Sequence, residues 1–369
     1  MAMARNGKPE ESPFERVDAC IRDLQDSRHG YRYKITRSPA TREAAMPLTI
    51  FALSGISIQK DTPREARLAY RAVGLLLLTL RDDSPGFLLD EAFPVISKAI
   101  QEAHDDAPTL VAVIDCLAAA SFAATCHVEE AMNAIWRVIV PTTSPVVLVA
   151  AVSAWTFLLT TIVSTTNTQR KADRTSWSAA IASLTEILDA DDRWVRMAAG
   201  EALAVCVELN LLTGKDMDVL ATKVSDLANE SAGKGRRRCL LREQKEMFAR
   251  LAAFLDHGEP PTTLVRRSRE RQDVMKVSTW VRLVQLNFLS KFLGNGFLEH
   301  VQGNPLLNEA FSFGRVEGKP LSIQKKGSSM ITNEFLRGLK RDWLWFSKNV
   351  FMLEVTRFWP QKLLQLGWH

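Results

Sequence analysis

Apolar residues recur along most of the chain at the three- and four-residue spacing of amphipathic helices, and strand-like alternation is hard to find. Helical runs cover 66–80, 86–103, 107–126, 128–139 and 178–189, each about as long as an average helix or longer. The loops are mostly short and polar, so consecutive helices should be antiparallel neighbours. The pattern predicts an all-α protein, an armadillo/HEAT-like α-solenoid of antiparallel helix pairs. An irregular all-α domain is the alternative.

Capping residues mark where these helices begin and end. Gly258 and Gly294 stand where two helices should stop, and each is predicted to adopt the left-handed conformation. Glu15 and Glu65 complete capping boxes at two helix starts. A polar capping residue followed by proline at the first helical position precedes four predicted helices, at Ser12–Pro13, Thr62–Pro63, Ser144–Pro145 and Asn304–Pro305.

The stretch 189–209, "DADDRWVRMAAGEALAVCVEL", gives the strongest local support for a HEAT-like repeat. Asp191 or Asp192 can cap a helix whose apolar residues share one face. Arg196 is predicted to be structural, because an arginine at this place in a HEAT-like helix links to the neighbouring repeat through an acidic cap. Small side chains should let a neighbouring helix approach closely, at Ala198, Ala199, Gly200 and Ala202.

One segment, 145–166, is apolar and long enough to span a membrane. It carries many Ser and Thr residues, and similar Ala-rich helices surround it. A helix that is apolar on every side can also be the inner layer of a large helical protein. The buried-helix interpretation is preferred, so no membrane partner is expected.

The sequence offers no catalytic constellation: the phosphate-binding, dinucleotide-binding, metalloprotease and nucleophile-elbow motifs are absent. Its 5 cysteines are dispersed and form no CxxC pair, which predicts reduced thiols in a cytoplasmic or nuclear protein. Cys126 and His127 are adjacent, but no further ligand lies near them in sequence, so both are interpreted as helix-end residues. The prediction is a protein that is not an enzyme, with no catalytic, cofactor-binding or metal-binding residues and no small-molecule substrate.

The positive charge of the chain is local. Residues 234–282 contain 13 Lys and Arg against 6 Asp and Glu, a net charge of +7, whereas the whole chain carries +5. The remaining residues therefore sum to −2. This local charge indicates a polyanion or an acidic partner. The candidate binding residues are Lys234, Arg236, Arg237, Arg238, Arg242, Lys245, Arg266, Arg267, Arg269 and Arg271.

Part of this charge lies where a helix should begin. Basic residues at a helix N-terminus add to the positive end of the helix dipole and cost stability. Such a site suits phosphate. Glu243 and Glu246 can pair with neighbouring basic residues and weaken the effect. A solvated charged face without a binding role remains the alternative.

Several segments together resemble the interferon-related developmental regulator family. They are "DRWVRMAAGEALAVCVEL" (192–209), the basic segment ending in a Phe-containing helix (233–256), and a C-terminal module at 278–314. This module resembles the C-terminal module of the family at ten positions. They are Trp280, Leu293, Gly294, Gly296, His300, Asn304, Leu306, Leu307, Phe311 and Gly314. Two stretches depart from the family pattern: an irregular 27–46, and a Trp- and Phe-rich end at 341–369 where a basic, polar tail is expected.

The resemblance implies a non-enzymatic regulator on an armadillo-type scaffold, acting through protein partners in transcriptional co-regulation or through ribosomes in translation. We expect docking on a ribosome, rRNA or another ribonucleoprotein; the alternative is a nuclear co-regulator that contacts proteins only. The predicted organisation is a disordered 1–12, a helical-repeat domain at 13–256, a basic linker at 257–277, the family module at 278–314 and an atypical, poorly ordered tail at 315–369.

Overall fold

The structure is a computed structural model that describes residues 63–79, 84–103, 105–140, 142, 144–165, 177–230, 237–266, 273–311 and 314–315. The predictions for residues 1–12, for the capping box at Ser12, for 27–46 and for 341–369 lie outside these residues. The chain divides into two compact units. One comprises the residues up to Ile135 together with Leu293–Asn304, and the other comprises Trp136–Phe292 and the residues from Pro305 onward. The predicted module at 278–314 is therefore shared between the two.

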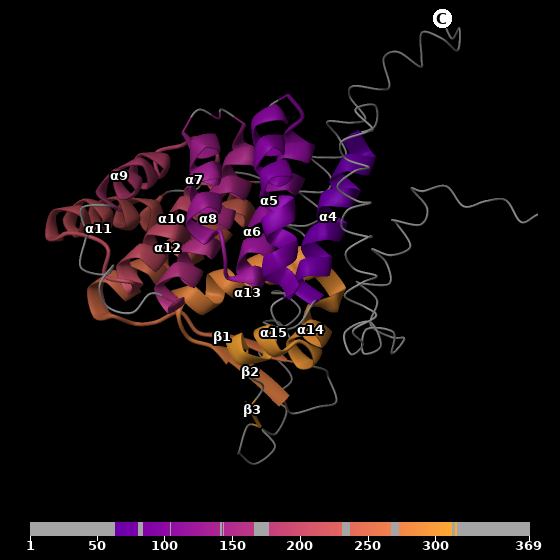
Figure 1. Ribbon diagram of the computed structural model, residues 1–369. Coiled ribbons are helices and arrows are strands. Elements are labelled where there is room, and N and C mark those ends of the chain that lie inside the picture. The colour runs from indigo at the N-terminus through magenta and orange to yellow at the C-terminus, as the bar shows by residue number, and fades with distance from the viewer. Residues whose placement is uncertain are drawn as a thin grey trace, which may run out of the picture. The chain divides into compact units, whose positions relative to one another are not determined.

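The first unit is built around helix α6 (Ala107–Ala124), against which α4 (Pro63–Thr79) and α5 (Ser84–Glu102) both pack (Figure 1). Helix α6 is buried over most of its length, including three consecutive alanines at 118–120 that let its neighbours approach closely. The unit also holds most of α7 (Val128–Ile139), the 3₁₀ turn Gly294–Gly296 and α14 (Phe297–Gly303).

The second unit has helix α10 (Arg193–Glu208) at its centre, in contact with α8 (Pro145–Thr165), α9 (Ser178–Ile187) and α12 (Arg237–His257). Helix α11 (Gly214–Asn229) packs on α12. Helix α13 (Trp280–Leu293) packs on α8, where the rings of Phe157 and Phe288 stack with centroids 4.1 Å apart. The described residues form an all-α helical-repeat fold, as predicted, with twelve α-helices and only a small sheet.

Helix boundaries follow the predicted capping signals. Helices α4, α8 and α15 (Pro305–Ala310) each begin at the proline that the sequence places at the first helical position. Gly258 and Gly294 both adopt the left-handed conformation, with φ of 67° and 57°. A Cβ atom is strained at such φ values, so glycine is the residue that ends a helix there at least cost.

Helices α6 and α8 are each long and apolar enough to cross a membrane by length and composition. Most of each is buried inside the protein, including Trp155, Phe157 and Leu158 of α8. The core helix of a soluble protein passes the same test. The burial therefore favours the interpretation of 145–166 as an inner helix.

Two strands lie in the segment 257–277, which was predicted to be a basic linker, and a third, short strand from the C-terminal side pairs with them. Strand β1 (Thr263–Arg266) pairs antiparallel with β2 (Asp273–Val277), which pairs with β3 (Gly314–Arg315). Residues alternate as strands require: Val265, Met275 and Val277 are buried, whereas Leu264 and Lys276 are exposed. Strands β1 and β2 have only four and five residues and β3 has two, so the alternation is too short to identify these strands from sequence.

Candidate polyanion-binding surface

The candidate surface is carried by helix α12, and α10 holds this helix in place. Gly200 of α10 faces Met247 and Phe248 of α12 so closely that a Cβ atom at Gly200 would lie 2.9 Å from a carbon of each. The small residues predicted to admit a neighbouring helix do so here, and α12 is that helix. Met247, Phe248 and Leu251 are buried against the core. The outer face of α12 is thereby directed to solvent.

A polar network joins α12 to α10 and to the end of α11. Arg196 donates from Nη2 to Gln244 Oε1 at 2.8 Å, and Gln244 donates from Nε2 to Glu230 Oε2 at 2.7 Å. Arg196 also lies 3.6 Å from Glu230 and donates to the Ala190 carbonyl at 2.8 Å. Arg196 thus has the structural, repeat-linking role predicted for it, through the acidic residue that follows α11.

This network holds the middle of α12 in place. Gln244 lies in the third turn of α12 and is fully buried, and its side chain is bonded both to Arg196 of α10 and to Glu230, which follows α11. The part of α12 that carries Arg242 and Lys245 is therefore tied to two other helices.

The structure places the predicted basic residues at two locations. Helix α12 begins at Arg237, with no acidic residue in its first turn, so Arg237 and Arg238 lie at its N-terminus as predicted. Arg242 is exposed and its Nε lies 2.6 Å from Glu246 Oε1, an ion pair that neutralises part of the charge. Lys245 is half-buried. Lys234 and Arg236 lie outside the described residues.

The second location is the β1–β2 hairpin. Arg266 is the last paired residue of β1 and faces Val274 across the ladder. Arg267, Arg269 and Arg271 belong to the connection between the two strands and lie outside the described residues. Thr263, the first residue of β1, lines a small pocket together with Arg250 of α12. The hairpin base therefore lies beside the middle of α12.

The basic residues of α12 do not form one compact pocket. Arg237 and Arg250 are 13 residues apart on this helix, which is about 20 Å at the α-helical rise of ~1.5 Å per residue. The outer face of α12 exposes Arg242, Glu246 and Arg250. A single phosphate could not engage both ends of this helix face, whereas an extended polyanion could contact both.

The C-terminal module residues are structural. Trp280 is buried, and the N–H groups of Trp280 and Val281 donate to the Glu208 carboxylate at 3.2 and 2.7 Å, so α10 caps the start of α13. Phe311 is buried and its N–H donates to the Leu307 carbonyl at 2.8 Å.

The other module residues organise the turn around α14. Gly294 and Gly296 form the 3₁₀ turn that precedes it. His300 is buried and its carbonyl accepts from the Asn304 N–H at 2.8 Å. The Asn304 side-chain amide donates to the carbonyl of Leu78 in the last turn of α4, so it caps that helix end.

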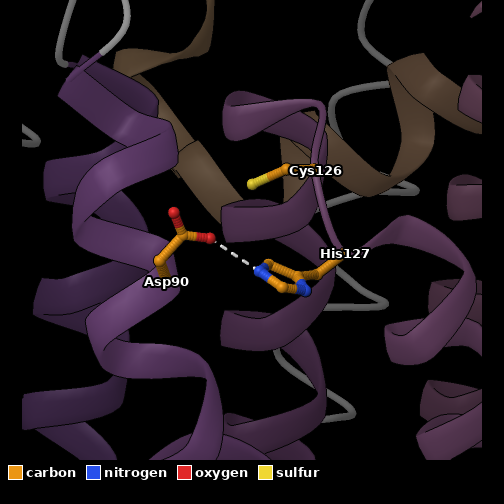
Figure 2. A group of neighbouring side chains, drawn as sticks. All are labelled: Asp90, Cys126 and His127. Carbon is orange, nitrogen blue, oxygen red and sulfur yellow. Dashed lines mark hydrogen bonds and ion pairs between the residues drawn. The ribbon is translucent and has the colours of Figure 1, made fainter.

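Two features went unnoticed in the sequence. Helix α11 begins with a capping box in which Thr213 and Asp216 satisfy each other's backbone N–H groups, and the spacing T-x-x-D is the signal that predicts it. The second feature is a cluster of Asp90, Cys126 and His127 (Figure 2), because Asp90 lies 37 positions before His127 and no local pattern joins them.

The fold and surface define an all-helical repeat protein with a basic segment on an anchored helix. Residues 43–256, more than half of the chain, match the model of the Interferon-related developmental regulator (IFRD) family. The chain belongs to this family, as its sequence pattern predicted.

Curated relatives carry the same name. The chain is 29% identical to "Interferon-related developmental regulator 2" of Mus musculus over 219 residues, covering 58% of this chain and 46% of the relative. It is 25% identical to the mouse and 24% identical to the human "Interferon-related developmental regulator 1" over 282 residues, covering 70% of this chain and 60% of each relative. The chain thus spans about half to three-fifths of the length of these relatives.

Proposed function

We propose that the chain is a non-enzymatic regulatory scaffold that docks on a ribosome or another ribonucleoprotein and modulates translation. The proposed docking surface comprises the predicted helical segment 234–250, of which the part from Arg237 onward lies on α12, and the predicted basic loop 266–271. Membership in a family whose relatives are named developmental regulators supports the regulatory part of the proposal. The proposal that the partner contains RNA is supported by the local positive charge of the chain and by the contacts that hold α12 in place.

The observation that carries the proposal is the confinement of positive charge to one segment. Residues 234–282 hold a net +7 in a chain whose other residues sum to −2. The Arg196–Gln244–Glu230 network holds the middle of α12, which lies in this segment. Arg242 and Lys245, which lie on the part of α12 that this network holds, lose less entropy on binding than charges on a free tail. Nucleic-acid backbones present phosphates in an extended array, which suits basic residues spread over about 20 Å along α12, from Arg237 to Arg250.

The ion pair between Arg242 and Glu246 lowers the net positive charge of the surface and decides which residues are mutated in the test. Arg242 is bound to Glu246, so it contributes less net field than its formal charge indicates. The first turn of α12, which begins at Arg237 and includes Arg238, contains no acidic residue, and Arg236 directly precedes it in the sequence. Reversal of these three charges should therefore weaken docking more than reversal of Arg242.

Affinity purification of the full chain from cell extract, with and without ribonuclease, tests the proposal. Ribosomal proteins and rRNA should co-purify, and ribonuclease together with 0.5 M salt should remove them. Partners that resist both treatments, with no rRNA recovered, would instead support a nuclear co-regulator that acts through protein contacts alone. That result would overturn the ribonucleoprotein proposal.

A further inference from the structure

The cluster of Asp90, Cys126 and His127 brings three different metal-binding side chains to one place. Asp90 lies on α5, and Cys126 and His127 lie in the turn between α6 and α7, all within the first unit. One potential ligand atom from each residue lies within 4.8 Å of the other two. Figure 2 shows the Asp90 carboxylate and the His127 ring facing each other, with the Cys126 sulfur on the same side.

The turn between α6 and α7 has an unusual backbone conformation, and the side chains of Cys126 and His127 lie on the side of this turn that faces α5. Thr125 and His127 both have positive φ, 54° and 53°. A β-branched residue such as threonine rarely adopts this conformation. The Thr125 N–H donates to the Ser121 carbonyl at 2.9 Å and closes α6. As a result, two adjacent side chains reach toward one neighbouring helix.

The imidazole is oriented before any ligand arrives. His127 Nε2 lies 2.7 Å from Asp90 Oδ1, and the Phe93 ring stacks on the imidazole with centroids 4.6 Å apart. Asp90 and Phe93 are three residues apart on α5, so they present one face to the turn. Stacking on Phe93 fixes the tilt of the ring, and the contact with Asp90 brings the carboxylate and the imidazole together before an ion binds.

Negative charge surrounds the thiol. Burial raises the pKa of the Cys126 thiol, and the charges of Asp90 and Glu130 raise the pKa further. A thiol used as a nucleophile needs the opposite, a lowered pKa. The same acidic surroundings attract a cation, and a cation would favour the thiolate.

We propose that Asp90, Cys126 and His127 bind one divalent transition-metal ion of the zinc class, with a fourth position open to solvent. Thiolate, imidazole and carboxylate are the ligands that Zn²⁺ takes in proteins. With metal–ligand bonds of about 2.0–2.3 Å, ligand atoms of a tetrahedral site lie about 3.3–3.7 Å apart. The Asp90–His127 pair would open and the sulfur would move inward, each by about an ångström or less. The Asp90 side chain is 63% exposed, which leaves access for the ion and for a water ligand.

Proton balance follows from the ligand types. The metal replaces the thiol proton of Cys126, which is released to solvent. The imidazole binds in its neutral form through one ring nitrogen and keeps its proton on the other, and the carboxylate binds as the anion, so one proton is released for each ion bound. The bound ion would connect α5 to the α6–α7 turn, so its binding should raise the thermal stability of the first unit.

Titration of the reduced full chain with Co²⁺ tests the site, because cobalt reports tetrahedral geometry and thiolate ligation in its absorption spectrum. Wild type should show intense d–d bands and a thiolate-to-metal charge-transfer band. Cys126→Ser should abolish the charge-transfer band, whereas the matched thiol control Cys239→Ser should keep it. Asp90→Asn and His127→Asn should each weaken affinity at least about tenfold, since even loss of an outer contact costs about 10- to 100-fold.

Two controls keep the test independent of folding. Asparagine accepts the positive φ of His127. Asp105→Asn removes an exposed carboxylate from the loop between α5 and α6, at the opposite end of this helix pair from the cluster. The proposal is overturned if wild type gives no tetrahedral cobalt spectrum or if the charge-transfer band persists in Cys126→Ser. It is also overturned if Asp90→Asn and His127→Asn bind Co²⁺ as tightly as Asp105→Asn does.

Discussion

The close approach of α10 and α12 can be tested at Gly200. In Gly200→Ala the new Cβ would lie 2.9 Å from Met247 Cε, 2.9 Å from Phe248 Cε1 and 3.2 Å from Phe248 Cζ. The methyl end of Met247 can move away, but Phe248 is fully buried and its ring is confined. Overpacking of this kind costs about 1–3 kcal/mol, and the better helix propensity of alanine returns about 1 kcal/mol. We expect a net loss of about 1 kcal/mol in the free energy of unfolding.

Urea unfolding measured by far-UV circular dichroism gives this value from the shift in midpoint at constant slope. Gly214→Ala is the matched control, because a Cβ atom at Gly214, the first residue of α11, meets nothing within 4 Å. Its stability should stay within about 0.5 kcal/mol of wild type. In a Phe248→Leu background the cost of Gly200→Ala should fall, with a coupling of about 0.5 kcal/mol or more. A Gly200→Ala protein at least as stable as wild type would refute the packing of α12 described above.

Two further predictions concern stability. Arg196→Met breaks the network that joins α10, α12 and Glu230 and leaves Gln244 without one of its partners. The free energy of unfolding, measured with urea, should fall by about 1–3 kcal/mol. The control Arg242→Met breaks only an exposed ion pair and should lower it by less than about 0.5 kcal/mol. Burial raises the pKa of the Cys206 thiol to about 12. The contribution of this thiol to the free energy of unfolding is constant below the pKa of an unfolded cysteine, about 8.5, and falls as pH rises above that value. Between pH 8 and pH 10 wild type should therefore lose up to about 2 kcal/mol more stability than Cys206→Ala, and equal losses would contradict the burial of this thiol.

Local signals in the sequence predicted most helix boundaries. Proline at Pro145 and the Asp192 side chain, which accepts from the N–H groups of Trp194 and Val195, act within one turn, so the sequence alone reveals them. The small residue Gly200 predicted that a helix would approach, but the identity of that helix depends on packing. The strands beside 267–272 were missed because four or five alternating residues give too weak a pattern.

Contacts between distant residues could not be predicted in the same way. Gln244 is one polar residue among many on α12, and its bond to Arg196 spans 48 positions. Asp90 is likewise brought to Cys126 and His127 only by the packing of the α6–α7 turn against α5. The predicted basic residues, in contrast, were recognised from charge alone, and the structure adds where the described ones lie: Arg237, Arg238, Arg242 and Lys245 on α12, and Arg266 at the end of β1.

Salt-dependent co-sedimentation with purified ribosomes tests the central claim most directly. Wild type should bind at 50 mM salt and lose about 10³-fold or more in affinity by 200 mM, as expected for six or more phosphate contacts. The triple variant Arg236→Glu, Arg237→Glu, Arg238→Glu should bind at least about tenfold more weakly at 50 mM, with a smaller salt slope. The matched control reverses three exposed charges elsewhere, in Lys98→Glu, Arg137→Glu, Lys215→Glu, and should bind nearly as wild type does. If the two triple variants sediment alike, or if wild type does not sediment with ribosomes at all, the basic segment is not the docking surface.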